Sequence, residues 1–420
     1  MAHNYKRLKL ACYTTNVSMS VVSNLSPLLF LTFRSLYGIS YSLLGLLVLI
    51  NFFTQLLVDL MFSFFSHKFN IPLTVKLTPF LTVAGLLIYA LCPFVLPDKF
   101  IYAGLAVGTV IFSASGGLVE VLISPVIAEI PSDDKDREMS KLHSIYAWGV
   151  VFVVIFATLF LFIFGQKSWQ WLTVILTAVP ICACLLYIGV DIPKMKTPEK
   201  TSGAFNMLKN GGIWLCVIAI FLGGAAECTM AQWCSSYIEG ALGISKIWGD
   251  IFGVALFALT LGFGRTLYSK IGKNIERVLF LGAIGAVLCY LTAALSNVAI
   301  VGLIACALTG FCVSMLWPGS LIVASDRFPG GVFIFALMAS GGDLGASVGP
   351  QLVGIVTDFV IEKSSAAELA ARFSLSPEQL GMKAGMLVGL LFPLFAVFVY
   401  LAIWKLFKKK DKISETLGQL

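Results

Sequence analysis

The chain has 420 residues, of which 58% are hydrophobic and only 12% are charged, and its mean hydropathy is +0.93. A soluble domain carries roughly twice that charged fraction, because its surface must be solvated, so a soluble globular protein is excluded. The net charge of +7 does not indicate a nucleic-acid partner, because the basic residues are scattered through short loops and the two ends of the chain.

Apolar runs of about 20 residues, enough to cross a ~30 Å hydrocarbon core as a helix, recur along the whole chain. Strand-like alternation does not recur, so the spans are helices and not strands of a barrel. We predict an all-α membrane protein with twelve transmembrane helices in two six-helix halves and with the lipid bilayer as its main solvent. The expected spans are 8–33, 39–66, 73–96, 100–130, 141–165, 169–190, 210–238, 247–270, 277–295, 298–324, 331–360 and 378–407.

A polar stretch from Asp191 to Lys209 separates the sixth and seventh spans. It predicts an N-terminal half over residues 1–190, a cytoplasmic linker over 191–209 and a C-terminal half over 210–420. An internal repeat with an offset of 193 residues supports the division, because Gly117, Pro125, Ser132 and Asp133 match Gly310, Pro318, Ser325 and Asp326. Duplicated halves of this kind surround a central site in secondary carriers.

The distribution of basic residues predicts the orientation of the chain. Only seven of the 29 Lys and Arg residues lie in odd-numbered loops, and the other 22 lie at the termini and in even-numbered loops. Because cytoplasmic loops carry the excess of Lys and Arg, we expect both termini in the cytoplasm. The prediction is a multi-pass protein of the cell membrane, an inner membrane, and a monomer.

Acidic residues inside the expected spans mark the candidate site, because an ionisable group at the bilayer centre costs at least about 2.5 kcal/mol. Four were identified: Asp59, Glu120, Glu227 and Asp343. Asp59 shares one helical face with Gln55 and Asn51, since the three are spaced by four residues. This stripe predicts either a water-lined surface or a hydrogen-bond network that holds helices together.

Glu120 lies in the fourth span, between the pair Gly116-Gly117 and the pair Ser124-Pro125. The proline predicts a break in the helical hydrogen bonding. A carboxyl group in such surroundings can be neutral in one state and charged in another, as a proton-coupled carrier needs. The alternative is a permanently protonated glutamate bonded to a neighbouring helix.

Glu227 begins a polar stretch of the seventh span that contains Trp233 and Tyr237, one helical turn apart. Two aromatic faces with polar edges suit the apolar faces and hydroxyl groups of a sugar. Aromatic residues also serve as anchors near a membrane interface.

Asp343 lies among glycines that let another helix approach closely. It is either a proton-coupling residue or a structural residue that holds helices together.

His143 and Tyr146 share a face of the fifth span. His143 is a candidate to relay a proton or to bind the solute, and the alternative is a structural histidine.

The ten cysteines show no metal-ligand spacing and are interpreted as packing residues, so neither a metal nor a cofactor is expected. The chain contains no Gly-x-x-x-x-Gly-Lys-Ser/Thr run, so the energy for transport must come from a gradient.

Several of these segments resemble the fucose permease (fucose–proton symporter) family of the major facilitator superfamily. The similarity is carried by Gly117-Leu118-Val119-Glu120 with Ser124-Pro125, by Leu142-His143-Ser144-Ile145-Tyr146-Ala147-Trp148-Gly149, by Glu227, Trp233 and Tyr237, and by Leu261-Gly262-Phe263-Gly264-Arg265. The resemblance implies a major facilitator fold, alternating access and proton-coupled uptake of a monosaccharide. It places Glu120 at the position of the family's fourth-span carboxylate, which takes part in proton coupling.

The chain departs from that family in its first span, where Ser23-Asn24-Leu25-Ser26-Pro27 replaces the stretch with the family's carboxylate. Asp59 is a candidate to supply the missing charge. We therefore predict a secondary carrier, not an enzyme, whose partners are protons and a small-molecule solute, with a sugar as the first candidate. The predicted proton-coupling residues are Glu120, Asp59 and Asp343, and the predicted solute contacts are Asn24, Gln55, Glu120, His143, Tyr146, Glu227, Trp233, Tyr237 and Trp317.

Two other functions remain open at this point. One is proton-driven efflux of an amphipathic compound. The other is a membrane sensor that binds a solute without moving it.

Overall fold

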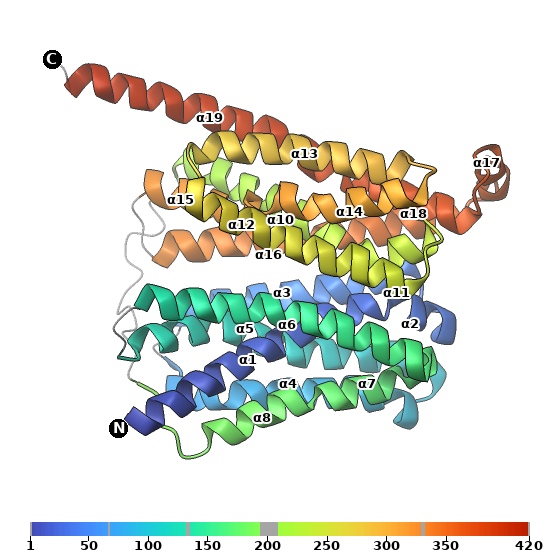
Figure 1. The fold of residues 1–420 in the computed structure, drawn as a ribbon, viewed down its shortest axis with the longest axis horizontal. Coiled ribbons are helices and arrows are strands. Elements are labelled where there is room, and N and C mark those ends of the chain that lie inside the picture. The colour runs from blue at the N-terminus through green and yellow to red at the C-terminus, as the bar shows by residue number, and fades with distance from the viewer. Residues whose placement is uncertain (1, 66–67, 132–134, 194–208, 329–331, 419–420) are drawn as a thin grey trace.

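The computed structural model describes residues 2–65, 68–131, 135–193, 209–328 and 332–418. Helices account for the regular structure of these ranges, and they form two bundles that lie side by side (Figure 1). Both chain ends lie at one end of the bundles, which we call the terminal face, and the other end is called the opposite face. The middle of the expected linker, residues 194–208, lies outside the described residues, and the predicted limits of the two halves stay a prediction.

The first bundle holds the helices of the N-terminal part of the chain. They are α1 (Ala2–Leu28), α2 (Phe30–Tyr37), α3 (Tyr41–Phe65), α4 (Ile71–Val95), η2 (Asp98–Phe100), α5 (Ile101–Glu129), α6 (Lys135–Phe164), η3 (Gln166–Ser168), α7 (Trp169–Leu176) and α8 (Ala178–Tyr187).

The second bundle holds the helices of the C-terminal part. They are α10 (Gly211–Gly240), α11 (Lys246–Gly249), the π-helical turn η4 (Asp250–Ala255), α12 (Leu256–Ile271), α13 (Ile275–Leu295), α14 (Ala299–Val313), α15 (Leu316–Arg327), α16 (Val332–Ile361), α17 (Ala366–Arg372), α18 (Pro377–Gly389) and α19 (Leu391–Gly418).

The number of membrane spans agrees with the sequence. Within the described residues, eleven helical segments are long and apolar enough to cross a membrane, and the bent pair α1–α2 brings the number to twelve. The pair is bent by 48° next to Pro27, because a proline removes a backbone donor and crowds the preceding turn. Pro125 has no backbone N–H and so lacks one helical hydrogen bond, but the helix does not end there, since α5 continues through this residue to Glu129.

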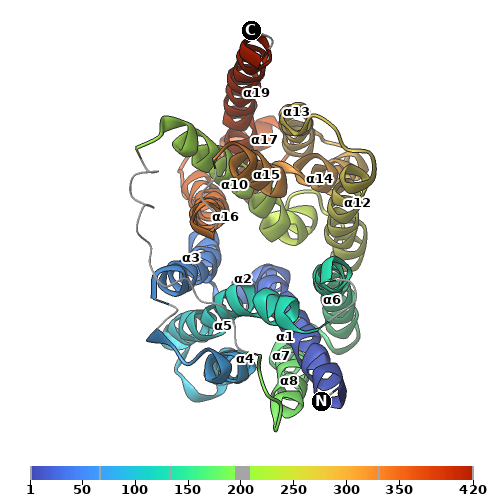
Figure 2. The same cartoon turned by 90° about the vertical axis from the view of Figure 1, so that its left-hand side faces the viewer.

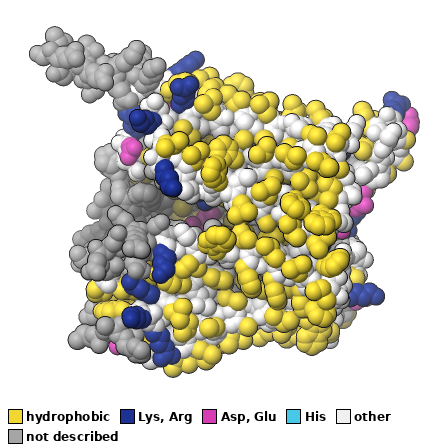
Figure 3. All heavy atoms as spheres, viewed as in Figure 1, with side chains coloured by type: hydrophobic (Ala, Val, Ile, Leu, Met, Phe, Trp, Pro, Cys, Tyr) yellow, Lys and Arg dark blue, Asp and Glu magenta, His cyan; other side chains and the backbone are white. Residues whose placement is uncertain are grey.

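Large apolar side chains cover the outside of both bundles (Figure 3). Phe94, Phe162 and Phe398 are exposed to 62%, 69% and 62%, and most of the basic side chains visible in Figure 3 lie toward the terminal face. An apolar outer surface of this extent is stable when lipid surrounds it. The chain is therefore a multi-pass membrane protein.

Helices α3 and α16, one from each bundle, run against each other along a contact that we call the α3–α16 seam (Figure 2). A Cβ atom on Gly45 would stand 3.1 Å from the Pro350 carbonyl oxygen, and one on Gly354 would overlap the carbonyl group of Tyr41. Small residues let helix backbones approach this closely. The seam therefore depends on glycine at both positions.

Replacing Gly354 by alanine is expected to destabilise the protein by about 1–3 kcal/mol, the usual cost of overpacking. The matched control is Gly262→Ala in α12, because a Cβ atom there meets nothing within 4 Å. Thermal unfolding of the purified variants measures the difference. Equal unfolding midpoints for the two variants would show that the seam tolerates a methyl group and that the close approach is not required.

Candidate solute pathway between the two bundles

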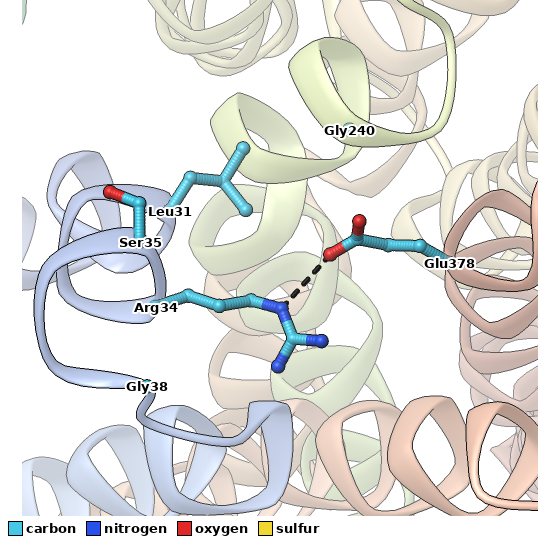
Figure 4. A pocket seen from close by; sticks show the side chains of 6 residues that line it. All are labelled: Leu31, Arg34, Ser35, Gly38, Gly240 and Glu378. Carbon is cyan, nitrogen blue, oxygen red and sulfur yellow. Dashed lines mark hydrogen bonds and ion pairs between the residues drawn. The ribbon is translucent and has the colours of Figure 1, made fainter.

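An ion pair with an added hydrogen bond joins the two bundles at the opposite face. Arg34 Nε of α2 donates to Glu378 Oε1 of α18 at 2.9 Å (Figure 4), and the Tyr41 hydroxyl of α3 donates to the same oxygen at 2.6 Å. The Arg34 guanidinium also lies 4.1 Å from the centre of the Tyr41 ring, a cation–π geometry. One carboxylate of the second bundle therefore holds two helices of the first.

Asp358 of α16 adds a second link between the bundles at this face. Its carboxylate accepts hydrogen bonds from the backbone N–H groups of Tyr41 at 3.0 Å and Ser42 at 2.6 Å. These are the first residues of α3, whose N–H groups have no partner within their own helix, and a negative charge is favourable there. The second bundle thus caps a helix of the first.

Asp250 forms a third link, between α6 and the turn η4. It is fully buried, accepts a hydrogen bond from Thr158 Oγ1 of α6 at 2.8 Å and another from the Ser235 hydroxyl, and pairs with Lys246 Nζ at 3.0 Å. A buried carboxylate is tolerated when a cation and hydrogen bonds compensate it. The three links together close the opposite face.

A recess of about 590 Å³ surrounds the Arg34–Glu378 pair (Figure 4). Tyr41, which binds the same glutamate, is fully buried, so the recess lies on the outer side of the closure. None of the four acidic residues predicted inside the spans lines it; its lining is Leu31, Arg34, Ser35, Gly38, Gly240 and Glu378. The candidate site is therefore sought deeper in the molecule.

Figure 3 shows a hollow between the two bundles, toward the terminal face and beside the atoms drawn in grey, and acidic side chains are visible in it. Glu120 of α5 is exposed although its neighbours Val119 and Leu122 are buried. Its carboxyl group lies within electrostatic reach of Asp59 on α3 and Asp343 on α16. Because an exposed carboxyl at this depth must be hydrated, Glu120 faces the hollow.

Glu227 of α10 and Arg265 of α12 form an ion pair in the second bundle. Arg265 Nη2 lies 3.0 and 3.3 Å from the two carboxylate oxygens of Glu227, and Arg265 Nε donates to the Ser314 carbonyl at 3.1 Å. The side chains of Glu227 and Arg265 are 15% and 44% exposed. Since arginine has five N–H donors and these contacts use only Nε and Nη2, Nη1 is left to face water or a solute.

Tyr146 of α6 lies near both Glu120 and the Glu227–Arg265 ion pair. Its hydroxyl is hydrogen-bonded to the Ser23 side chain of α1, and it lies within electrostatic reach of both Glu120 and Arg265. Asn24, the next residue on α1, is half-buried, and its Nδ2 donates to the Ser20 carbonyl at 2.9 Å. These side chains place hydroxyl and amide groups of the first bundle opposite the ion pair of the second.

Trp317 of α15 brings an aromatic surface to the same region. The side chain is half-buried, and a Cβ atom on Gly224 of α10 or Gly342 of α16 would stand less than 3 Å from its indole ring. Because the two glycines have no side chain, the indole ring fits against their backbone. Of the two tryptophans predicted as solute contacts, Trp317 is the more exposed, since Trp233 is buried.

Three of the predicted solute contacts, Trp233, Tyr237 and Gln55, are buried between helices in this structure. Trp233 is 1% exposed, and its Nε1 donates to the Pro350 carbonyl at 2.9 Å. Tyr237 is also 1% exposed, and its hydroxyl donates to the Ala293 carbonyl at 2.7 Å. Both rings face helix contacts and offer no surface to a solute, because a buried aromatic residue with a polar edge settles where that edge finds a partner.

Gln55 is buried between α3 and α5, where it fills the space beside Gly116. Asn51, on the same face, accepts a hydrogen bond from the Ser113 hydroxyl at 2.5 Å. For these two residues the hydrogen-bond network between helices is the better interpretation of the stripe. His143 lies in α6, and its side chain is outside the described part of the chain.

Sequence reasoning missed three charged residues that the structure makes important. Arg265 was named as part of a family-like segment and was given no role in the site, although it lies within α12. Asp250 and Asp358 were not recognised as acids inside spans. The signal for Arg265 was a lone arginine in the apolar run of the eighth span, which needs an acidic partner, and the signal for Asp250 was Lys246 four residues earlier.

Two helical bundles closed at one face and hollowed around charged groups from the other have the architecture of a secondary carrier. A family model described as the Major Facilitator Superfamily matches residues 11–350. The chain belongs to this superfamily.

Solved structures share the fold at low sequence identity. A bacterial homologue of the human lysosomal transporter Spinster, in an inward-facing and occupied conformation, is 14% identical over 96% of this chain and 97% of its own, with a TM-score of 0.71. A D-xylose–proton symporter is 14% identical over 93% and 97%, with a TM-score of 0.71. The fucose:proton symporter FucP of E. coli is 16% identical over 92% and 98%, with a TM-score of 0.56. No curated protein sequence gives a significant match.

Proposed function

We propose that the chain is a proton-coupled secondary carrier that takes up a monosaccharide or a similar small polar solute by alternating access. The observation that carries the proposal is the position of Glu120, an exposed carboxyl group in a hollow whose other end is closed. Such a group can exchange a proton with the side to which the hollow opens. The opposite face would admit solute after the links of Arg34, Asp358 and Asp250 have opened.

The basic residues support an orientation with both termini in the cytoplasm. In that orientation the hollow opens to the cytoplasm, and the structure corresponds to an inward-open state. Uptake would then begin from a state in which the α3–α16 seam and the Asp250 link have parted at the outer side.

The proposed solute contacts are Tyr146, Asn24, Trp317, Glu227 and Arg265. They combine hydroxyl, amide and guanidinium groups with one aromatic face, the combination that suits a polyhydroxylated ring. Two of the structures with this fold are described as sugar–proton symporters, which supports a sugar as the first solute to test. Neither a cofactor nor a second subunit enters this proposal.

A counterflow assay tests the solute class. Purified protein in liposomes loaded with unlabelled monosaccharide is expected to take up the labelled sugar in a saturable way, because exchange needs only the reorientation of the loaded carrier. Liposomes without protein are the control. A broad sugar panel without exchange would contradict the sugar proposal, and binding without exchange would favour a sensor.

The charge of the hollow favours a second candidate, proton-driven efflux of an amphipathic compound. Glu120 lies close to the Asp59–Asp343 pair, and the positive charge of Arg265 is already balanced by Glu227. An excess of acidic groups attracts a solute with a positive charge. Exchange of an amphipathic cation in the same liposomes, with no sugar exchanged, would support this candidate.

A further inference from the structure

Asp59 of α3 and Asp343 of α16 meet carboxyl to carboxyl across the α3–α16 seam. Each side chain is only 4% exposed. One oxygen of each, Oδ1 of Asp59 and Oδ2 of Asp343, is buried without a conventional hydrogen-bond donor. Two acidic side chains from different bundles therefore face each other in a closed space.

A carboxylate only accepts hydrogen bonds, and a carboxyl group donates one only when it is protonated. Two ionised carboxylates in contact repel each other, so a pair that shares a site retains a proton on one member. A well-packed contact between Asp59 and Asp343 thus contains at least one hydrogen that the carboxyl groups themselves supply. The proton would lie between one bundle and the other.

Within the described residues, no positively charged group faces the pair. The titratable groups that face the pair within the described residues are Glu120 from α5 and Cys228 from α10, an acid and a thiol. Neither aspartate forms an ion pair with a described residue, and Arg265 is held by Glu227. A proton is therefore the cation that fits the site.

We propose that Asp59 and Asp343 together form a second proton-binding site, distinct from Glu120, in which one proton shared between the bundles keeps the α3–α16 seam closed. Loss of this proton leaves two adjacent carboxylates, which push α3 and α16 apart. The site acts on the equilibrium between conformations, whereas Glu120 exchanges its proton with the hollow. This inference rests on the proposed function only in that the seam must open during transport.

Infrared spectroscopy of purified protein tests the site without transport. We use Glu120→Gln as the background, so that the Glu120 carboxyl does not contribute. In that background the spectrum at neutral pH is expected to show a protonated-carboxyl band that disappears at alkaline pH. Adding Asp59→Asn, or separately Asp343→Asn, is expected to shift the frequency of that band, because the proton of the remaining buried aspartate then has an asparagine amide as its partner and no longer a second carboxyl group.

A band that persists unchanged in both double variants would overturn the proposal, since the proton would then belong to another group. Two different asparagine variants guard against misfolding of one of them, and size-exclusion chromatography checks both. Solute exchange provides a second readout. It is expected to fall at alkaline pH in Glu120→Gln and to persist there in Glu120→Gln/Asp59→Asn, and the same alkaline loss in both would also count against the shared proton.

The two proposals can fail separately. If Glu120→Gln still accumulates solute against a gradient, the proposed role of Glu120 is wrong, and the infrared result stands by itself. If the band is absent while Glu120→Gln loses accumulation, the coupling role of Glu120 stands and the second proton site is refuted.

Discussion

Replacing Glu120 by glutamine is expected to abolish accumulation of solute driven by a pH gradient, while exchange at neutral pH stays within about twofold of the wild type. Glutamine keeps the shape and hydrogen-bonding capacity of the side chain but cannot bind a proton. With one proton per solute, a gradient of one pH unit supports about tenfold accumulation. The variant is expected to reach no accumulation, measured with labelled solute in liposomes with an acidic exterior.

Glu368→Gln is the matched control, because Glu368 is 73% exposed in its pair with Arg372 at the opposite face. This variant is expected to accumulate solute like the wild type. Accumulation by Glu120→Gln at the wild-type level would show that the coupling proton binds elsewhere. The exposed position of Glu120 in the hollow would then serve the solute and not the gradient.

Arg265→Gln is expected to reduce solute exchange by at least about tenfold and to lower stability by about 1–3 kcal/mol. The expected loss of stability lies between the about 0–1 kcal/mol that exposed ion pairs contribute and the about 3–5 kcal/mol lost when a buried pair is broken. The pair is intermediate, because Glu227 is 15% and Arg265 44% exposed. The single variant leaves the Glu227 carboxylate without a cation at membrane depth. Thermal unfolding and counterflow measure the two effects.

The double variant Glu227→Gln/Arg265→Gln separates the charge pair from the solute contact. Two glutamines are neutral and can bond to each other, so stability is expected to recover to near the wild-type value. Exchange is expected to stay low, because the guanidinium donors that face the hollow are missing. Full recovery of exchange in the double variant would show that Arg265 only balances Glu227, and Arg372→Gln on the exposed pair serves as the control.

The fold was predictable from the sequence because lipid imposes a simple rule on every span. An apolar run of sufficient length must be helical, and this placed the spans within a few residues of their positions in the structure. Local detail was less predictable. Pro125 does not interrupt α5, whereas the helix pair around Pro27 is sharply bent, and the difference depends on packing that a single sequence does not reveal.

The acidic residues of the candidate site were predictable from the sequence, but the residues that they contact were not. Glu120, Asp59, Asp343 and Glu227 stand out because a charge in an apolar run is expensive. Periodicity assigns a residue to a face of its helix, but it does not say which helix lies opposite. Trp233 was therefore given a solute contact, although its indole bonds within a helix interface, and the pairing of Glu227 with Arg265 was not foreseen.

Simultaneous recording of solute and proton movement tests the central claim most directly. Liposomes with wild-type protein and no imposed gradient are given external solute, and the pH of a weakly buffered exterior is followed together with labelled uptake. The account predicts that the exterior becomes more alkaline as solute enters, since each solute carries a proton inward, and that Glu120→Gln removes the pH change. Solute uptake with no pH change, or with acidification of the exterior, would contradict it.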